Sequence, residues 1–399
     1  MSEMSILYLH IGTPKTGTTA IQHFLASNKR ILQSKGYIFP NFEMRFENVP
    51  PKRNAHFLID KVYNKEADTL DYKTQINQCY ESIYTALETY ENVILTDEAI
   101  WHACVKIDNF WEDLNERIIS RGHQLKLIVY LRRQDEFIQS YWKYKVLEKE
   151  TGGFMKYVNS KKYAFFPLNY HTHLTSIAEK IGKDNIIIRV YEKGQYKGAN
   201  KTIISDFLYT IGLEFTDEYK LEENLQNTNV DFICTEIKRR LNSIPEFWDK
   251  RGYIRGYMTE VSEQYKSEGK YQFKSLFAPE EQDLFLQKYE EENRKIATEW
   301  LGRADGKLFY NPVLYDENEK KFSTMDYVKT CGVIFSLMEQ DIEELKLEKE
   351  MLEEEVKLLG HKLSLKKSFK WLRNILNHVV PNKYKKTKIW KTLQEKTNS

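Results

Sequence analysis

A glycine-bounded turn near the start of the chain constrains its fold more than any other segment. Residues 11–22 read Ile-Gly-Thr-Pro-Lys-Thr-Gly-Thr-Thr-Ala-Ile-Gln, which is the frame of a phosphate-binding loop: Gly12, four residues, Gly17 and two hydroxyl residues. An apolar run over residues 5–11 precedes the turn, and helical spacing of apolar residues continues from Thr18 to a stop at residues 35–36. A strand, a tight turn and a helix aim backbone N–H groups at an anion. The expected fold is α/β, with a P-loop-type parallel sheet flanked by helices.

The lysine of this loop is displaced from its position in the nucleoside-triphosphate version. In that version, Lys follows the second Gly and reaches the β- and γ-phosphates. Here Thr18 occupies that position, and Lys15 lies three residues earlier. We expect a lysine at that place to lie nearer the first phosphate than a third one. This favours a donor whose transferable group is carried on its 5′-phosphate, so a nucleotide phosphosulfate fits the loop better than ATP.

A second segment carries further candidate residues. Residues 125–131, Leu-Lys-Leu-Ile-Val-Tyr-Leu, predict another buried strand, and Arg132 follows it directly. Ser140 lies eight residues further on, about two turns into the helix expected next. Ligands of doubly wound sheets bind at the carboxyl ends of the strands. Arg132 and Ser140 are therefore predicted to hold one more phosphate through a charge-assisted contact and a hydroxyl donor.

Together these segments resemble the sulfotransferases that use 3′-phosphoadenosine 5′-phosphosulfate (PAPS). Residues 14–19 look like the 5′-phosphosulfate loop of that family, and Arg132 with Ser140 looks like its 3′-phosphate motif. The similar region covers about residues 5–312 and extends to bacterial enzymes that sulfate cell-surface carbohydrate. Relatives carry Asp-Pro after the strand-end Arg, whereas this chain has Arg133-Gln134. The resemblance implies a sulfotransferase-like domain whose donor-binding residues are Pro14, Lys15, Thr16, Gly17, Thr18, Thr19, Arg132 and Ser140.

The resemblance also implies the reaction, which is transfer of a sulfuryl group to a hydroxyl of a saccharide acceptor without a metal ion. Lys15 is expected to neutralise charge on the leaving phosphate. The base has two candidates: Glu98, after the apolar run 92–97, and His56, in an irregular stretch before that run. Similar bacterial sequences tend to have a His and a Glu at these places. A carboxylate needs burial to raise its pKa, whereas the pKa of His is already near working pH; Asp97 and His102 are weaker candidates.

Composition and cysteine spacing agree with a large α/β domain in a reducing compartment. The chain has 399 residues and four scattered cysteines, without a C-x-x-C pair or the spacing of a metal site. The first strand is expected almost at Met1, so no secretory segment is expected before it. No apolar run reaches the length of about 18 residues that a membrane helix needs. The expected location is the cytoplasm, at the inner face of the plasma membrane.

The last part of the chain has a different pattern from the rest. We expect a domain over residues 1–312, a linker over 313–335, a coiled coil over 336–364 and a basic amphipathic tail over 365–399. Residues 361–399 hold ten Lys and one Arg against a single Glu. The coiled coil predicts a homo-oligomer, and the tail predicts contact with an anionic membrane rather than nucleic acid. The heptads comprise Met338, Leu345, Leu352 and Leu359, interleaved with Ile342, Lys349, Val356 and Leu363.

Three alternatives stay open at this point. The heptads also fit a helix that packs on its own domain. The run from Val93 to Asp97 resembles the strand and Asp that hold Mg²⁺ in P-loop kinases, although Thr18 replaces the lysine that supports the γ-phosphate. A non-catalytic adaptor with a relict nucleotide fold is the third alternative. Segments 140–175 and 245–275 are rich in aromatic and basic residues, which favours a saccharide over a lipid or a protein tyrosine as acceptor.

Overall fold

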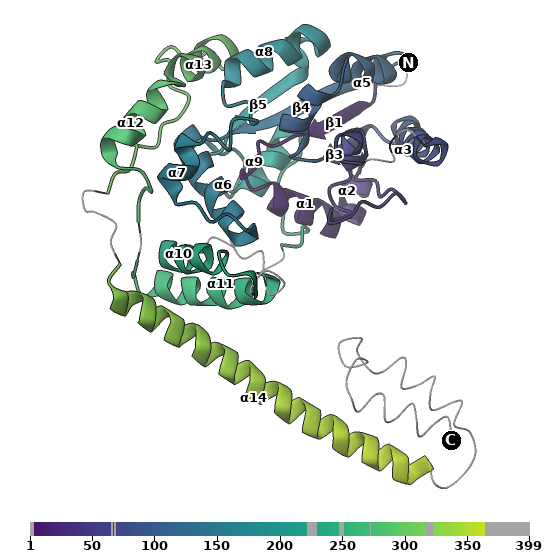
Figure 1. Cartoon of the computed structure of the whole chain (residues 1–399). Helices are drawn as coiled ribbons and strands as arrows, with labels where there is room; N and C mark the ends of the chain where they lie inside the picture. Colours follow the sequence, from purple (N-terminus) through teal and green to yellow (C-terminus); the bar gives the residue numbers. More distant parts are fainter. Residues whose placement is uncertain are drawn as a thin grey trace. The chain divides into compact units, whose positions relative to one another are not determined.

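The computed structural model describes residues 4–64, 67, 69–221, 230–246, 251–271, 273–316 and 322–363. Two compact units divide the chain, Met1–Thr330 and Cys331–Ser399. The first unit contains a five-stranded sheet in the order β2-β3-β1-β4-β5, and all of its strand pairs are parallel (Figure 1). The predicted α/β class with a parallel sheet is therefore confirmed. The strands are β1 (Ile6–His10), β2 (Tyr37–Ile38), β3 (Asn92–Thr96), β4 (Gln124–Leu131) and β5 (Ile186–Val190).

Helices cover both faces of this sheet because alternate strand residues point to opposite faces. In β1, Leu7 and Leu9 belong to one apolar cluster, and Tyr8 belongs to another on the opposite face. The first cluster includes side chains of α3 (Leu70–Thr89), α5 (Phe110–Ile119) and α8 (Tyr170–Ile181). The second includes side chains of α1 (Thr18–Ser27), α2 (Lys29–Ser34) and α9 (Ile203–Thr210). The sheet is thus the middle layer of three (Figure 1).

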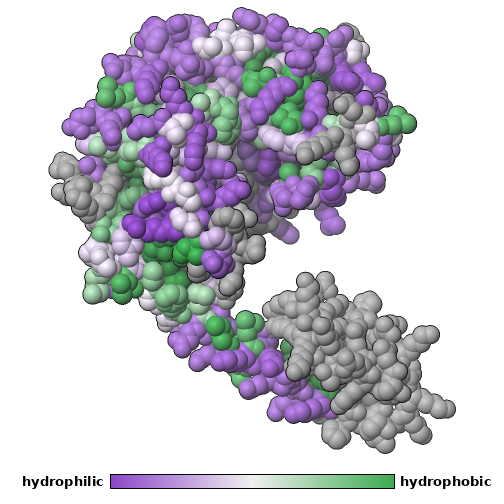
Figure 2. Space-filling model, viewed as in Figure 1, coloured by the Kyte–Doolittle hydropathy of each residue, from purple (hydrophilic) through white to green (hydrophobic). Residues whose placement is uncertain are grey.

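A second group of helices packs around α6 (Gln134–Glu148), which follows β4. Its neighbours are α7 (Phe154–Asn159), α10 (Phe232–Leu241), α11 (Arg251–Ser267) and α12 (Pro279–Gln287). The described part of this unit also contains α4 (Ile100–Ala103), α13 (Glu290–Lys295) and a π-helical turn at Ile296–Trp300. Its short 3-10 turns are η1 (His56–Leu58), η2 (Asp60–Val62), η3 (Cys104–Lys106), η4 (Lys183–Asn185) and η5 (Lys193–Gln195). Hydrophilic residues dominate the face of this unit seen in Figure 2, in keeping with apolar burial in the two clusters.

The strand order brings three loops together. The central strand β1 pairs with β3 on one side and with β4 on the other, and His10 lies in register with Thr96 and Ile128. The segments that leave the carboxyl ends of these strands therefore start side by side. In parallel sheets, this edge is where ligands bind.

The Arg133-Gln134 pair, where the resemblance leads us to expect Asp-Pro, begins α6 without an intervening turn. Arg133 is the N-cap residue, and its Nη1 donates to the carbonyls of Asn311 (2.9 Å) and Pro312 (3.3 Å). Gln134 Nε2 donates to the Leu168 carbonyl at 3.2 Å. These two side chains therefore hold the end of β4 against the loop before α8 and against the end of the predicted domain.

The second unit is described up to residue 363, within the helix α14 (Thr324–Leu363). This helix begins inside the segment that composition assigns to a linker, because Ser323 and Asp326 hydrogen-bond to each other across its first turn. The heptad side chains of Ile342 and Leu345 are 47% and 44% exposed. An exposed apolar seam is what a coiled coil requires, and self-association stays a prediction. The basic tail 365–399 lies outside the described residues.

None of the helices in the described ranges combines the length and the apolar content needed to cross a bilayer. All four cysteines are free thiols, and three of them are buried: Cys79, Cys104 and Cys234.

Candidate active site

The loop between β1 and α1 is fixed against β4. Backbone N–H groups of Ile11 and Thr13 donate to the carbonyls of Ile128 (3.1 Å) and Tyr130 (2.8 Å). Gly12 has a positive φ of 98°, and a Cβ placed there would lie 3.0 Å from the Pro14 nitrogen and 3.2 Å from the Glu98 Cβ. Only glycine fits this position without displacing its neighbours. The loop is therefore held in one course directly beside Glu98.

The N-terminus of α1 is left open. Gly17 is its N-cap residue, no side chain caps the helix, and its first turn carries no acidic residue. Thr18 is buried and Thr19 is exposed, while the Thr16 hydroxyl donates to the Thr13 carbonyl inside the loop. The first N–H groups of a helix have no partner within the helix, and the helix dipole favours negative charge there. The geometry therefore leaves N–H groups of α1 available to an anion.

Lys15 carries the positive charge of this loop. Its backbone lies in the left-handed region, with a φ of 67°, which is uncommon for a residue with a side chain. The side chain is half-buried, and Nζ lies 5.1 Å from the centre of the Tyr144 ring. Burial, followed by the positive charges of Arg132 and Arg255, lowers the pKa of Lys15 to about 8, whereas Glu98 acts in the opposite direction. An anion placed here would relieve this excess of positive charge.

Arg132 is tied directly to the same loop. Its Nη1 donates to the Lys15 carbonyl at 2.7 Å, and its Nε lies 3.4 Å from Glu136 Oε2. The Tyr170 hydroxyl donates to the Arg132 carbonyl at 2.6 Å, and the guanidinium lies 5.3 Å from the Tyr191 ring centre. The strand-end arginine predicted from sequence therefore lies next to the phosphate-loop lysine.

Arg132 and Ser140 both line one polar cavity of about 600 Å³. Lys143, one helical turn after Ser140, lines it as well, and burial, aided by the Arg132 charge, lowers the pKa of Lys143, whereas Asp231 opposes the shift. The sequence reasoning missed Lys143, although its spacing of three residues from Ser140 on a predicted helix could have revealed it. The cavity thus offers cations, carboxylates and a hydroxyl, with α6 on one side and α11 on another; its lining also includes Arg133, Asp135, Glu136, Gln139, Asp231, Ser262 and Glu263.

Asp97, directly after β3, is the centre of a buried network. Its Oδ2 lies 2.8 Å from His56 Nδ1, and its Oδ1 accepts from Arg53 Nη2 at 2.6 Å and from the Ala99 N–H at 2.7 Å. Burial alone would raise the pKa of Asp97, but the His56 hydrogen bond and the Arg53 charge outweigh it and hold this pKa below its ordinary value. His56 Nε2 lies 3.6 Å from Asp60 Oδ1. Both ring nitrogens of His56 therefore face carboxylates.

Glu98, the other predicted base, faces the loop. Gln22 Nε2 donates to its Oε2 at 2.8 Å, and Arg53 Nε lies 3.7 Å from its Oε1. The side chain is 21% exposed, whereas that of His56 is 6% exposed. Arg53 connects the two predicted bases, since it also pairs with Asp97. No local pattern in the sequence marks Arg53, because both of its partners lie more than 40 residues further along the chain.

The structure therefore brings Lys15, Glu98 and Arg132 together around the loop and places His56 behind Asp97. Pro14, Thr16 and Thr18 are buried parts of the loop and of the start of α1. Within the ranges that the structure describes, no three His, Cys, Asp or Glu side chains are grouped so that they could hold a metal ion.

Comparisons with known proteins give distant likenesses, among them the following two. No family model matches the chain. An uncharacterized protein of Archaeoglobus fulgidus is 28% identical over 180 residues, which are 44% of this chain and 46% of that protein, so the match spans about half of each. The crystal structure of a sulfotransferase from Alicyclobacillus acidocaldarius matches 65% of this chain and 97% of its own chain, with 11% identity and a TM-score of 0.32. Neither likeness identifies an activity for this chain, so we argue its function from the side chains of the site.

Proposed function

We propose that this protein transfers the sulfuryl group of 3′-phosphoadenosine 5′-phosphosulfate to a hydroxyl of a saccharide, as in the assembly of a bacterial cell-surface glycan. The observation that carries this proposal is the position of Lys15. It lies inside the loop rather than after Gly17, its pKa is lowered to about 8, and its carbonyl accepts a hydrogen bond from Arg132. Two cations and an uncapped helix N-terminus therefore converge at the carboxyl edge of the sheet.

The residues fit a nucleotide with phosphates at both its 5′ and 3′ positions. The N–H groups at the start of α1 and the Thr18 hydroxyl would hold the 5′-phosphate. Arg132 and Ser140 would hold the 3′-phosphate, with Lys143 as a third contact in the same cavity. The cavity volume, about 600 Å³, lies in the range of roughly 300–1,000 Å³ found for small-ligand sites.

The chemistry of transfer can be assigned to two side chains. The donor supplies a sulfuryl group whose bond to the phosphate oxygen breaks while a bond to the acceptor oxygen forms. Lys15 would stabilise the negative charge that grows on the phosphate oxygen, an effect that is largest in a water-poor site. The Glu98 carboxylate would accept the proton of the acceptor hydroxyl, since it is partly exposed beside the loop. We assign His56 to holding Asp97, because both of its ring nitrogens face carboxylates.

The kinase alternative fits the geometry less well. In a P-loop kinase, an Asp at the end of the strand beside the phosphate loop would help to hold Mg²⁺, and here that residue is Asp97 after β3. Both oxygens of Asp97 already have partners: Arg53 and the Ala99 N–H at Oδ1, and His56 with Arg53 at Oδ2. The side chain is also fully buried. A magnesium ion could bind Asp97 only after these contacts were broken.

Calorimetric titration of the full chain tests the proposal. We expect adenosine 3′,5′-bisphosphate to bind without Mg²⁺, with the same affinity when Mg²⁺ is added, and ATP to bind at least tenfold more weakly. Preferential, Mg²⁺-dependent binding of ATP would support a kinase instead. If neither nucleotide bound, the protein would be better described as an adaptor with an inactive nucleotide fold.

A further inference from the structure

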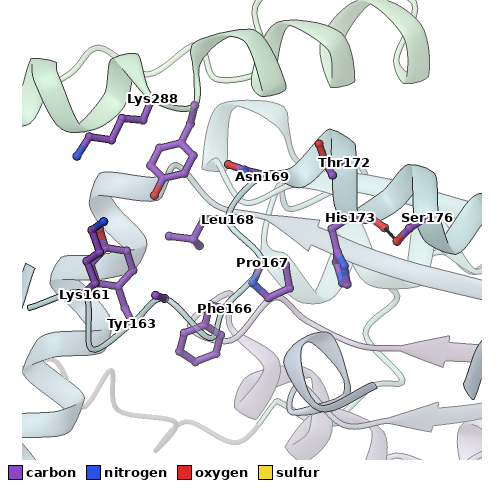
Figure 3. A pocket seen from close by; sticks show the side chains of 12 residues that line it. Lys161, Tyr163, Phe166, Pro167, Leu168, Asn169, Thr172, His173, Ser176 and Lys288 are labelled. Atoms are coloured by element: carbon purple, nitrogen blue, oxygen red, sulfur yellow. Dashed lines mark hydrogen bonds between the residues drawn. The ribbon is translucent and has the colours of Figure 1, made fainter. Parts of the chain in front are cut away.

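A groove outside the donor site lies between the loop before α8, α8 itself and the turn from α12 to α13 (Figure 3). Its volume is about 590 Å³, within the range of small-ligand sites. The rings of Tyr163, Phe166 and Tyr289 are buried and form its floor. The exposed rim carries polar groups, and Figure 3 shows Lys161 and Lys288 at one end and Ser176 at the other. An apolar floor with a polar rim is a typical ligand-binding arrangement.

A path of aromatic contacts joins this groove to the reaction centre. Lys15 Nζ lies 5.1 Å from the Tyr144 ring centre, and the Tyr144 and Tyr141 ring centres are 5.8 Å apart. Tyr141 contacts Phe166 at 4.7 Å, and Phe166 lines the groove. Its neighbour Phe165 is 45% exposed and contacts both Tyr141 and Phe166, at 6.3 and 4.2 Å. The Phe165–Phe166 pair therefore separates the groove from the side chains around Lys15.

A second series of contacts connects Phe165 to Glu98. Phe165 contacts the His102 ring at 5.4 Å, and His102 Nε2 lies 3.4 Å from the Tyr63 hydroxyl. The Tyr63 ring is stacked on His56 with 6.1 Å between centres, and it is 51% exposed. From His56 the contacts continue through Asp97 and Arg53 to Glu98. Lys15 and Glu98 are thus joined by a series of contacts with Phe165 near its middle. We call the aromatic members of this series the aromatic arc: Tyr144, Tyr141, Phe166, Phe165, His102, Tyr63 and His56.

We propose that the acceptor is an oligosaccharide held at two places: the sugar to be sulfated lies against the aromatic arc, and a neighbouring sugar of the same chain lies in the groove beyond Phe165. The proposal rests on the proposed function, since it names the acceptor of that same site. Exposed aromatic rings offer flat apolar faces against which the C–H face of a sugar ring packs. Tyr63 and Phe165 provide such exposed faces on the arc, and the largely buried rings of Tyr163, Phe166 and Tyr289 give the groove an apolar lining.

Polar groups in the groove favour a saccharide over a lipid tail. His173 is buried, and its Nε2 has no hydrogen-bond partner among the described residues. Burial lowers the pKa of His173 to about 4, so the ring is neutral near pH 7 and adds no charge to the groove. Asn169 and Lys161 add exposed donors at the rim. A hydrocarbon chain in the groove would cover Asn169 and Lys161 without offering them a hydrogen-bond partner, which costs free energy.

The test compares saccharides of different length on the full-length protein by calorimetry, with and without adenosine 3′,5′-bisphosphate. The probes are glucose and cellohexaose, N-acetylglucosamine and chitohexaose, and galacturonic acid and its hexamer. We expect at least one hexasaccharide to bind about tenfold or more tightly than its monosaccharide, the equivalent of 1.4 kcal/mol. Equal affinity within every pair, or no binding by any of the six, would overturn the proposal.

Two variants locate the effect. Ser176 is an exposed residue of the groove whose hydroxyl donates to the His173 carbonyl, so Ser176→Arg should fill the groove and reduce the length effect to less than threefold. Ser82→Arg is the matched control, since Ser82 is an exposed helical serine whose hydroxyl donates to the Gln78 carbonyl. Phe165→Ala should weaken the binding of both short and long saccharides. An unchanged length effect in Ser176→Arg would overturn the assignment to the groove.

The outcome also separates this inference from the proposed function. If adenosine 3′,5′-bisphosphate binds and saccharide length has no effect, the donor site stands and the groove assignment fails. If the nucleotide does not bind but the hexasaccharide preference depends on Ser176, the groove stands as a saccharide site and the sulfuryl-transfer proposal fails.

Discussion

Two charged regions lie at the carboxyl ends of neighbouring strands, and they differ in how their charges are compensated. After β3, Asp97 is fully buried, and both of its oxygens bind Arg53 or His56. After β1, Lys15 is half-buried, and no carboxylate of the described residues lies within salt-bridge distance of it. A buried charge that is paired within the protein is needed by its partners, since removal of one member leaves an uncompensated buried charge. A partly exposed cation without such a partner is free to bind an anionic ligand, so we assign Asp97 to the scaffold and Lys15 to the chemistry.

The largest effect is expected from removal of the compensated charge. Asp97→Ala leaves His56 and Arg53 without their carboxylate, so it should lower the free energy of unfolding by about 3–5 kcal/mol. Urea denaturation followed by circular dichroism measures this loss. Asp108→Ala is the control, because Asp108 is exposed and should change stability by less than about 0.5 kcal/mol. A similar stability of the two variants would contradict the scaffold role of Asp97.

Removal of the uncompensated charge of Lys15 should lower the activity of the protein and leave its stability nearly unchanged. Lys15→Ala should lower the rate of sulfuryl transfer by roughly 10²–10³, or about 3–4 kcal/mol, because it deletes the cation beside the breaking bond. Its free energy of unfolding should stay near that of the unmodified protein, since no ion pair is lost. Lys145→Ala is a matched control, because Lys145 lies 5.9 Å from the same Tyr144 ring but pairs with Glu148. Near-normal transfer by the Lys15 variant would contradict the mechanism.

The contrast between the two regions also shows what the sequence could predict. The strand before the loop was predicted over residues 5–11 and is observed at Ile6–His10, and the run 125–131 corresponds to β4. Apolar periodicity and glycine positions are local properties, so they predict such elements well. The helical pattern from Thr18 to a stop at residues 35–36 is observed as two helices, because Asn28 separates α1 from α2. Asn28 Nδ2 donates to the Lys220 carbonyl at 2.9 Å, a contact between segments 192 residues apart.

The partners of side chains were harder to predict than helices and strands, because they depend on contacts between segments far apart in the sequence. Lys15, Arg132 and Ser140 could be named because their spacing relative to a strand end is itself informative. The pairing of Arg53 with Asp97 and the contact of Phe165 with His102 join segments far apart in sequence. Such contacts depend on how α6, the loop before α8 and the segment before α3 pack over the sheet edge. His56 is one of the two candidate bases named from the sequence; its ring nitrogens face Asp97 and Asp60 in the structure, and its role stays a prediction.

A smaller effect on affinity should distinguish residues that bind the 3′-phosphate of the donor nucleotide from residues that bind its 5′-phosphate. Arg132→Ala and Ser140→Ala should each weaken adenosine 3′,5′-bisphosphate much more than adenosine 5′-monophosphate, which lacks the 3′-phosphate. For the arginine, the expected loss is about 1.5–3 kcal/mol, the value of a hydrogen bond to a charged group. Calorimetry on both nucleotides measures the difference, with Ser160→Ala as a control outside the cavity lining. Equal losses for both nucleotides would place Arg132 and Ser140 at another part of the ligand.

The smallest effect concerns pH and distinguishes the two regions directly. The pKa of Lys15 is lowered to about 8, so the side chain is charged below this pH and loses its charge as pH rises through it. Affinity for adenosine 5′-monophosphate should therefore fall by about twofold from pH 7 to 8 and by about tenfold from pH 7 to 9, a change of about 1.4 kcal/mol over the whole interval. In Lys15→Arg the fall should disappear, because arginine stays charged throughout this range. The Asp97 carboxyl, whose pKa is held below its ordinary value, stays ionised over the same interval and cannot produce this dependence.

Titrations in buffers of different ionisation enthalpy should show proton uptake on binding above pH 8 in the unmodified protein and none in Lys15→Arg. An affinity that does not change up to pH 9.5 would mean that the Lys15 charge does not act on the 5′-phosphate.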